Sequence, residues 1–309
     1  MNPKWPVVSS FNHGWSRDIL PALRVESGAT VEIKALDASG GQFSATSTST
    51  DIARLNFERV NPVTGPIFIE GAMPGDAIRV ELLEFKPSGW GWTGIIPGFG
   101  LLAEDFSDPH LIGVEYDKEL AAFLPGVAHV PTKFFAGEIG LAPSEPGVHS
   151  AVPPRRVGGN LDTRDISTGS TLFLPVEVEG GLFSLGDTHA AQGDGEVCGT
   201  AIETAMDVTV RLSVEKSRNL PAPQFITAGP VSRHHDALGY FVTTGIGPDL
   251  MRAAQDAVRA MIDHMGREYA IAPKDAYCLC SVATDLRITE IVDMPNVIVA
   301  CYLPLAVMV

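Results

Sequence analysis

Positively charged side chains are scarce in this sequence. It has 22 Lys and Arg against 37 Asp and Glu, which gives a formal net charge of -15 at pH 7. Nucleic acids and anionic membrane surfaces are bound through clustered Lys and Arg, so we expect neither as a partner. A small neutral or cationic molecule suits this charge better.

Cysteines and long apolar segments are also few. The cysteines at positions 198, 278, 280 and 301 form no C-x-x-C pair and no evenly spaced set, so we expect free buried thiols and no disulfide framework. The N-terminus lacks the apolar segment of a signal peptide, and no apolar run approaches the roughly 18 residues of a membrane-spanning helix. We therefore expect a soluble cytoplasmic protein.

Glycine and proline, in contrast, are plentiful, at 31 and 23 residues, which is typical of a turn-rich globular fold. Helical periodicity is strong only from Pro248 to Arg267, and a second short helix is expected after Pro273. The alternation of apolar and polar residues predicts β-structure elsewhere. The segments that carry this β pattern are 24–35, 67–70, 77–85, 197–214 and the apolar end of the chain, 297–309.

We therefore predict a mainly β fold, with β-sandwich or barrel-like units, and an α+β C-terminal part. A β-rich catalytic region would cover residues 1–215, and an α+β region over 216–309 would pack against it. The Trp- and Gly-rich segment 88–100 is predicted to be a loop that crosses the core, with a substrate-pocket wall as the alternative.

Two further polar segments are predicted to be exposed. Residues 104–136 are interpreted as an irregular, solvated loop, because charged clusters such as Asp105, Asp108 and His110 usually lie at the surface. His234 and His235 are adjacent and would point to opposite sides of an extended chain, so a surface loop is expected there as well.

The side chains best suited to chemistry gather in the middle of the chain. Asn160 and Asp162 are two residues apart, as are Asp187 and His189, so on extended backbone each pair would project from one face. Carboxylates with a single imidazole suit Zn²⁺ or another divalent cation. Residues 171–185 are interpreted as a hairpin that would bring the two pairs together.

The same stretch carries a family resemblance. GGNLD at 158–162 and, above all, GDTHAAQGDGEVCGTAIE at 186–203 resemble the acetamidase/formamidase family. Shorter matches extend the resemblance over nearly the whole chain, among them GIIPGFG at 94–100, GLAP at 140–143 and DLRI at 285–288. The resemblance implies hydrolysis of short aliphatic amides, of the formamide or acetamide type, to carboxylate and ammonia, and it suggests a homo-oligomer.

The resemblance and the spacing together give each polar residue an expected role. A metal-activated water would attack the amide, with Zn²⁺ as the expected ion and Ca²⁺ as the alternative. Glu203 is the predicted general base, on a strand face that it shares with Ala201 and Ala205, and Glu196 is its rival. The predicted metal ligands are Asp162, Asp187 and His189, and the predicted substrate-binding residues are Asn160, Gln192, Asp194 and His13.

Two other functions stay open at this stage. Cys198 could act as a covalent nucleophile with Glu203 as its base, although its acidic surroundings do not favour a thiolate. The chain could also be a non-catalytic β-rich protein that binds a metal or a sugar, because acidic pairs in Gly-rich loops also form Ca²⁺ sites.

Overall fold

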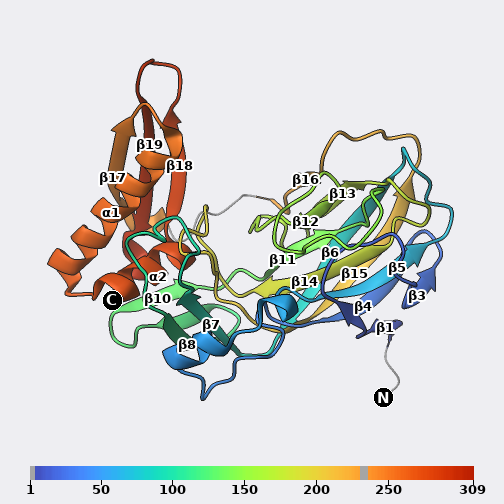
Figure 1. Ribbon diagram of the computed structural model, residues 1–309, viewed down its shortest axis with the longest axis horizontal. Coiled ribbons are helices and arrows are strands. Elements are labelled where there is room, and N and C mark those ends of the chain that lie inside the picture. The colour runs from blue at the N-terminus through green and yellow to red at the C-terminus, as the bar shows by residue number, and fades with distance from the viewer. Residues whose placement is uncertain (1–3, 230–235) are drawn as a thin grey trace.

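The computed structural model describes residues 4–229 and 236–309 and is mainly β, as predicted. His234 and His235 lie outside the described residues. The larger part consists of two six-stranded sheets (Figure 1). The first sheet has the order β1 (Val7–Val8), β4 (Ala29–Ala35), β15 (Met206–Glu215), β6 (Ala77–Pro87), β13 (Thr171–Pro175) and β16 (Gln224–Ile226).

The second sheet carries the strands that matter most for the site. Its order is β12 (Gly158–Asn160), β11 (Phe135–Gly140), β14 (Phe183–His189), β5 (Val63–Ile69) and β2 (Phe11–Asn12), with β3 (Leu23–Val25) also paired to β5. Strand β14 lies between β11 and β5 and is buried along its whole length.

The two sheets share one hydrophobic core, as the alternation of residues predicts. Val31 and Ile33 of β4 and Val80 of β6 point inward from the first sheet, and they belong to the same buried cluster as Ile139 and Leu185 of the second. Each strand can bury only alternate side chains, so two sheets that face one another bury both apolar faces. The β-sandwich part of the prediction is confirmed.

The segment 88–100 is not the predicted loop. Its centre forms β7 (Trp90–Ile95), which pairs antiparallel with β8 (His110–Glu115). Glycines let this strand lie close to the neighbouring backbone. A Cβ at Gly91 would lie 2.6 Å from the Glu203 carbonyl oxygen, and one at Gly94 would lie 2.5 Å from the His110 carbonyl oxygen. The glycines thus serve close backbone approach within β-structure.

The prediction of a solvated loop over 104–136 is wrong for much of this segment. It contains β8, β9 (Leu120–Phe123) and β10 (Ala128–Pro131), and β9 pairs with β10. Its charged residues bind the C-terminal helices. The contacts are Asp105 with Arg259 at 2.6 Å, Asp108 with Lys274 at 3.1 Å and His110 with Asp275 at 2.6 Å.

The C-terminal part is α+β, as predicted. Its sheet has the order β17 (Tyr240–Gly247), β19 (Val297–Pro304) and β18 (Asp285–Glu290), and it stands at one end of the molecule in Figure 1 with α1 (Leu250–Tyr269) along it. The second helix, α2 (Pro273–Ala283), begins at the predicted proline. The short 3-10 helices of the chain are η1 (Ser49–Arg54), η2 (Phe57–Arg59), η3 (Asp236–Leu238) and η4 (Leu305–Val307).

The boundaries of α1 differ slightly from the prediction. Asp249 caps the helix by accepting a hydrogen bond from the Arg252 N–H at 2.7 Å, and Gly266 lies inside the helix, which ends where Ala270 adopts a left-handed conformation. A side-chain cap thus defines the start more sharply than the preceding proline does. Among the described residues, no helix is long and apolar enough to cross a membrane.

Two predictions near the site are wrong. Residues 171–185 do not form a hairpin, because β13 pairs with β6 and β16 in the first sheet, whereas β14 pairs with β11 and β5 in the second. Gly180 and Gly181, both at positive φ, let the chain cross between the sheets. The strand predicted over 197–214 begins only at Met206, so Glu203 precedes it.

The division of the chain at residue 215 stays a prediction. Strand β16 still pairs with the first sheet, and α2 contributes to the same core as the sandwich. One buried ion pair also fastens the two parts together. Arg164 donates to both carboxylate oxygens of Asp285, at 2.5 and 3.1 Å, and both side chains are almost fully buried.

Because of this ion pair, we expect two aspartate substitutions to differ widely in how much they lower the free energy of unfolding. Asp285→Ala leaves the Arg164 guanidinium buried without its main partner, so we expect a loss of about 3–5 kcal/mol in the free energy of unfolding. Asp108→Ala removes an exposed partner of Lys274 and serves as the control, with an expected change below about 1 kcal/mol. Urea unfolding of both variants measures this, and equal changes would contradict the structural role of Asp285.

Candidate functional site

The site is built on the end of strand β14. Asp187 and His189 are two residues apart on this strand and point to the same side, as their spacing predicts. The Asp187 Oδ1 atom lies 3.2 Å from His189 Nε2. On the neighbouring strand β11, Phe135 is opposite His189 and packs its ring edge-on against the imidazole, with the ring centroids 4.9 Å apart. The imidazole is therefore held in one place.

The hydrogen bonds of Gln192 fix which nitrogen of His189 carries the proton. The Gln192 amide nitrogen donates to the Asp162 carbonyl at 2.7 Å, so its side-chain oxygen is the atom that faces His189 Nδ1 at 2.9 Å. Nδ1 is then a donor, and in the neutral imidazole the lone pair is on Nε2, which faces the carboxylates of Asp187 and Glu203. A histidine ordered in this way is suited to bind a metal through Nε2.

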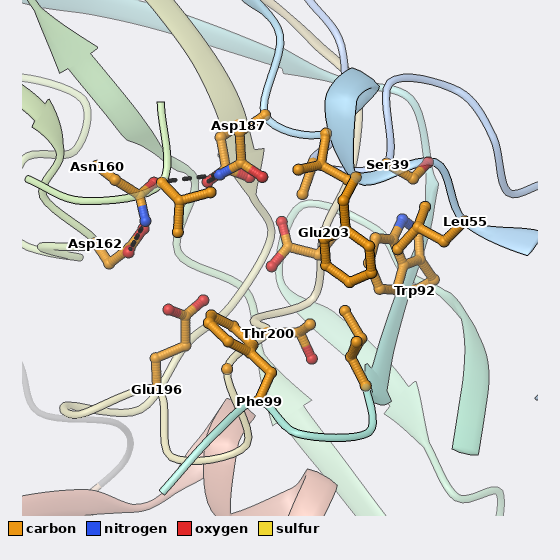
Figure 2. A pocket seen from close by; sticks show the side chains of 17 residues that line it. Ser39, Leu55, Trp92, Phe99, Asn160, Asp162, Asp187, Glu196, Thr200 and Glu203 are labelled. Carbon is orange, nitrogen blue, oxygen red and sulfur yellow. Dashed lines mark hydrogen bonds between the residues drawn. The ribbon is translucent and has the colours of Figure 1, made fainter. Parts of the chain in front are cut away.

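Three carboxylates surround this nitrogen in a common arrangement. One oxygen of each accepts an N–H: Asp187 from Asn61 at 3.1 Å, Asp162 from Asn160 at 2.7 Å, and Glu203 from the Ala201 backbone at 2.8 Å. The other oxygen of each is buried and has no hydrogen-bond partner among the described residues. Figure 2 shows these side chains turned toward one shared space.

Glu203 reaches the site from a bridging segment and not from a strand. Its backbone exchanges two hydrogen bonds with Trp92 of β7, at 2.7 and 2.9 Å, and it also forms an isolated bridge with His189. Its free Oε2 atom lies 3.1 Å from His189 Nε2. The backbone of Glu203 thus joins β7 to β14, and its side chain completes the acidic group.

Burial of so many acids changes their pKa values. Burial, and then the charge of Asp187, raise the pKa of Asp162 to about 7, and burial raises the pKa of Glu203 to about 8. Burial also raises the pKa of Glu196 well above its usual range. For His189, burial lowers the pKa, but the carboxylates of Glu203 and Asp187 together hold it well above the usual value. The site therefore attracts positive charge strongly.

The residues present fit a bound divalent cation. His189 Nε2 lies close to two carboxylate oxygens, yet these atoms are not aligned as hydrogen bonds. Two groups of three side chains could each hold an ion. The first group is Asp162, His189 and Glu196, and the second is Asp187, His189 and Glu203. Buried oxygens that lack donors, arranged around a free imidazole nitrogen, are what a metal site requires.

A glycine makes room for this arrangement. A Cβ at Gly137 of β11 would lie 2.5 Å from Asp162 Oδ1 and 2.7 Å from His189 Cε1. Any side chain there would displace two of the groups just described. Because Asp162 itself has a φ of +43°, and Asp187 one of +48°, the backbone is also in an unusual conformation at both carboxylates.

Sequence reasoning missed two residues of the site. Glu138 of β11 is fully buried beside the acidic group, and neither of its carboxyl oxygens is hydrogen-bonded in the part of the chain that the structure describes. Burial, then Asp187 and Asp162, raise its pKa well above the usual range, although the nearby Asn61 amide opposes this. A lone acid within the apolar and glycine-rich run FAGEIG is a signal that could have identified Glu138. For Asn61 we find no such signal.

Three of the predicted substrate-binding residues, His13, Gln192 and Asp194, do not line the cavity at this site. His13 packs edge-on against Phe11, and Asp194, whose side chain is 52% exposed, pairs with Arg164 at 3.3 Å. Asn160 does line the cavity, and Gln192 acts by orienting His189. The substrate-binding roles of all four residues stay predictions.

The thiol of Cys198 is also outside the cavity. All four cysteines are free and buried, as predicted. Burial raises the pKa of Cys198, but hydrogen bonds with Cys278, Ser281 and Thr200 lower it to about 6. The thiol contacts the Gly94 carbonyl oxygen at 3.5 Å and does not face the acidic group. This geometry does not favour the covalent alternative.

The acidic group forms one end of a cavity of about 510 Å³ (Figure 2). Residues from widely separated parts of the chain line it. Its polar lining residues are Ser39, Asn61, Asn160, Asp162, Asp187, Glu196, Thr200 and Glu203, and its other lining residues are Ala38, Leu55, Phe57, Val60, Trp92, Ile96, Phe99, Val152 and Gly199.

Comparisons with known proteins agree with the resemblance seen in the sequence. The model of the acetamidase/formamidase family matches residues 6–151 and 145–309. The chain is 26% identical to a formamidase from Methylophilus methylotrophus, covering 97% of this chain and 90% of that protein.

Solved structures are similar over the same length. A gamma lactamase from Delftia acidovorans superposes with a TM-score of 0.89 at 25% identity, covering 96% of this chain and 89% of that one. An acetamidase from Bacillus halodurans gives a TM-score of 0.68 at 31% identity, covering 97% of each chain. The chain therefore belongs to the acetamidase/formamidase family of amide hydrolases.

Proposed function

We propose that the protein hydrolyses carboxamides, of the formamide or acetamide type, to carboxylate and ammonia with the help of a bound divalent cation. The observation that carries this proposal is the set of inward-facing oxygens of Asp162, Asp187 and Glu203 around His189 Nε2. The names of the relatives support amide hydrolysis, and the free imidazole nitrogen favours Zn²⁺ over the all-oxygen coordination that Ca²⁺ prefers.

Asp162, Asp187 and His189 are the ligands that we propose, a set that takes one aspartate from each of the two groups that share His189. A divalent cation bound there would lower the pKa of the attacking water and polarise the amide carbonyl. Asn160 donates a hydrogen bond to Asp162 Oδ2, and Asn61 donates one to Asp187 Oδ2. The Oδ1 atom of each aspartate is thereby kept pointing into the site. Gln192 keeps the proton of His189 on Nδ1. These contacts preorganise the site before substrate arrives.

Glu203 is the proposed general base. Its Oε2 is free, burial raises its pKa, and its other oxygen is fixed by the Ala201 N–H. It would accept a proton from the attacking water and pass it to the nitrogen as the C–N bond breaks, so that one water is consumed and carboxylate and ammonia leave. Glu196 lines the same cavity next to Asp162 and is the rival for this role.

A cyclic amide is the second candidate substrate. The observation that favours it is the TM-score of 0.89 with the gamma lactamase, against 0.68 for the Bacillus halodurans acetamidase. The same residues would serve, but ring opening keeps the amine and the carboxylate in one product. Release of ammonia therefore distinguishes the two substrate types.

We also propose that the chain forms a homo-oligomer. Large apolar side chains are exposed on the C-terminal part, including Ile246 at 61%, Met251 at 61% and Ile288 at 54%. Burial of such side chains against a second copy would remove them from water. The cytoplasmic location stays a prediction.

The first prediction from this proposed function concerns the metal. Purified protein should release ammonia from formamide, acetamide or propionamide, with urea as a comparison, lose this activity after treatment with a chelator, and regain it with added Zn²⁺. A thiol enzyme would be insensitive to the chelator, and a binding protein would be inactive throughout. Full activity in protein shown by elemental analysis to be metal-free would overturn the metal-assisted mechanism.

The second prediction separates metal binding from proton transfer. His189→Ala should lose both bound metal and activity. Glu203→Gln should keep the metal and lower kcat by about 10²–10⁴-fold, because the amide preserves shape but cannot accept the proton. Metal content and kcat should be measured together, with Glu119→Gln, an exposed glutamate on the turn before β9, as the control. If Glu203→Gln loses its metal, Glu203 is a ligand and not the base.

The third prediction concerns assembly. Sedimentation at micromolar concentration should give a mass that is a multiple of 32.9 kDa. A single species at the monomer mass would end the proposal of a homo-oligomer.

A further inference from the structure

The cavity is much larger than the amides named so far. A water molecule takes about 30 Å³ in the liquid, so acetamide, with four non-hydrogen atoms, would fill only about a quarter of 510 Å³. The remaining space lies on the side away from Asp162 and Asp187. A substrate that fills the cavity needs roughly ten or more non-hydrogen atoms.

The far side of the cavity is an apolar wall. Figure 2 shows Trp92 and Leu55 across from Asp162 and Asp187. Trp92, Leu55 and Ile96 are at most 9% exposed, and they belong to a small core cluster, with Phe43 and Ile52, that is distinct from the main core. The cluster packs Ile52 of η1 and Phe43 against β7, and its side toward the cavity forms the wall.

The wall is held rigidly. The Trp92 indole N–H donates to Asp37 Oδ1 at 3.0 Å, and Phe43 packs edge-on against the indole with the centroids 4.8 Å apart. Asp37 is itself fixed, because it accepts from the Ser39 backbone N–H at 2.8 Å. The indole is therefore a fixed surface that presents its apolar part to the cavity.

Apolar side chains continue to the mouth of the cavity. Phe57, Phe99 and Val152 come from three separate segments, and they are 59%, 44% and 38% exposed. Their exposure is unfavourable in water, and an apolar ligand that enters past them would cover them. Both the wall and the mouth thus favour an apolar group.

We infer that the site takes carboxamides whose acyl group is bulky and apolar, such as an arylalkyl or cycloalkyl group, in preference to acetamide. This inference rests on the proposed amide hydrolysis. The amide group would lie at the acidic end, and the acyl group would lie against Trp92, Leu55 and Ile96. Each buried CH₂ contributes about 0.8 kcal/mol, which is roughly a four-fold gain in kcat/KM, so the preference should grow with the size of the acyl group.

The test compares kcat/KM of the metal-loaded protein for acetamide, propionamide, cyclohexanecarboxamide and phenylacetamide. We expect kcat/KM to rise along this series, with phenylacetamide at least ten-fold above acetamide. A flat or falling series overturns the inference but leaves the proposed amide hydrolysis intact. Failure to hydrolyse any of the amides overturns the proposed function, and the inference with it.

Two variants test whether the wall causes the preference. Ala38→Phe fills part of the cavity and should lower the ratio of kcat/KM for phenylacetamide to that for acetamide at least ten-fold. Ala53→Phe, the same change at an exposed position on η1 outside the cavity, should leave the ratio as it was. Phe57→Ser at the exposed mouth should also lower the ratio without disturbing the core. An unchanged ratio in both Ala38→Phe and Phe57→Ser overturns the role of the wall.

Discussion

The candidate site depends on one costly arrangement, the burial of several carboxyl groups around a single imidazole. Removing a charge from water costs several kcal/mol even after the protein relaxes, and like charges nearby add to that cost. The chain offsets part of it by giving Asp162, Asp187 and Glu203 one N–H donor each. The inner oxygens receive no such help. Stability is thus lowered at the group of side chains to which we assign the binding of positive charge.

The rest of the fold keeps this arrangement in place. Strand β14 pairs with β5 as far as Gly186 and with β11 out to His189, and His189 also bridges to Glu203, so the end of the strand that carries Asp187 and His189 is held in place. The loop that carries Glu196 is held from another direction. The Leu286 N–H donates to the Asp194 carbonyl oxygen, and the Asp194 N–H lies 3.3 Å from an oxygen of Asp285, which is paired with Arg164. The C-terminal sheet therefore supports the site without lining its cavity.

Much of this could be predicted from the sequence, and the failures have identifiable physical causes. Periodicity predicted the sandwich strands and α1, because both depend on local alternation between buried and exposed positions. The pairing of Asp187 with His189 followed from their spacing on a strand. Local patterns could not show that β13 and β14 belong to different sheets, since the partners of a strand are chosen by distant segments. Asn61 was missed for the same reason. Trp92 was interpreted mainly as a core residue, whereas one side of its ring packs in a core cluster and the other faces the cavity.

The site is assembled from segments that lie far apart along the chain. Asn61 and Asp187, which share a hydrogen bond, are 126 positions apart, and Glu203 comes later still. Long loops of the unfolded chain must close before these groups can meet, and such closure makes β-rich folds slow to form. A growing chain therefore lacks the complete candidate site until synthesis has passed Glu203, and a protease cut between Asn61 and Glu203 would leave neither fragment with all of the groups of that site.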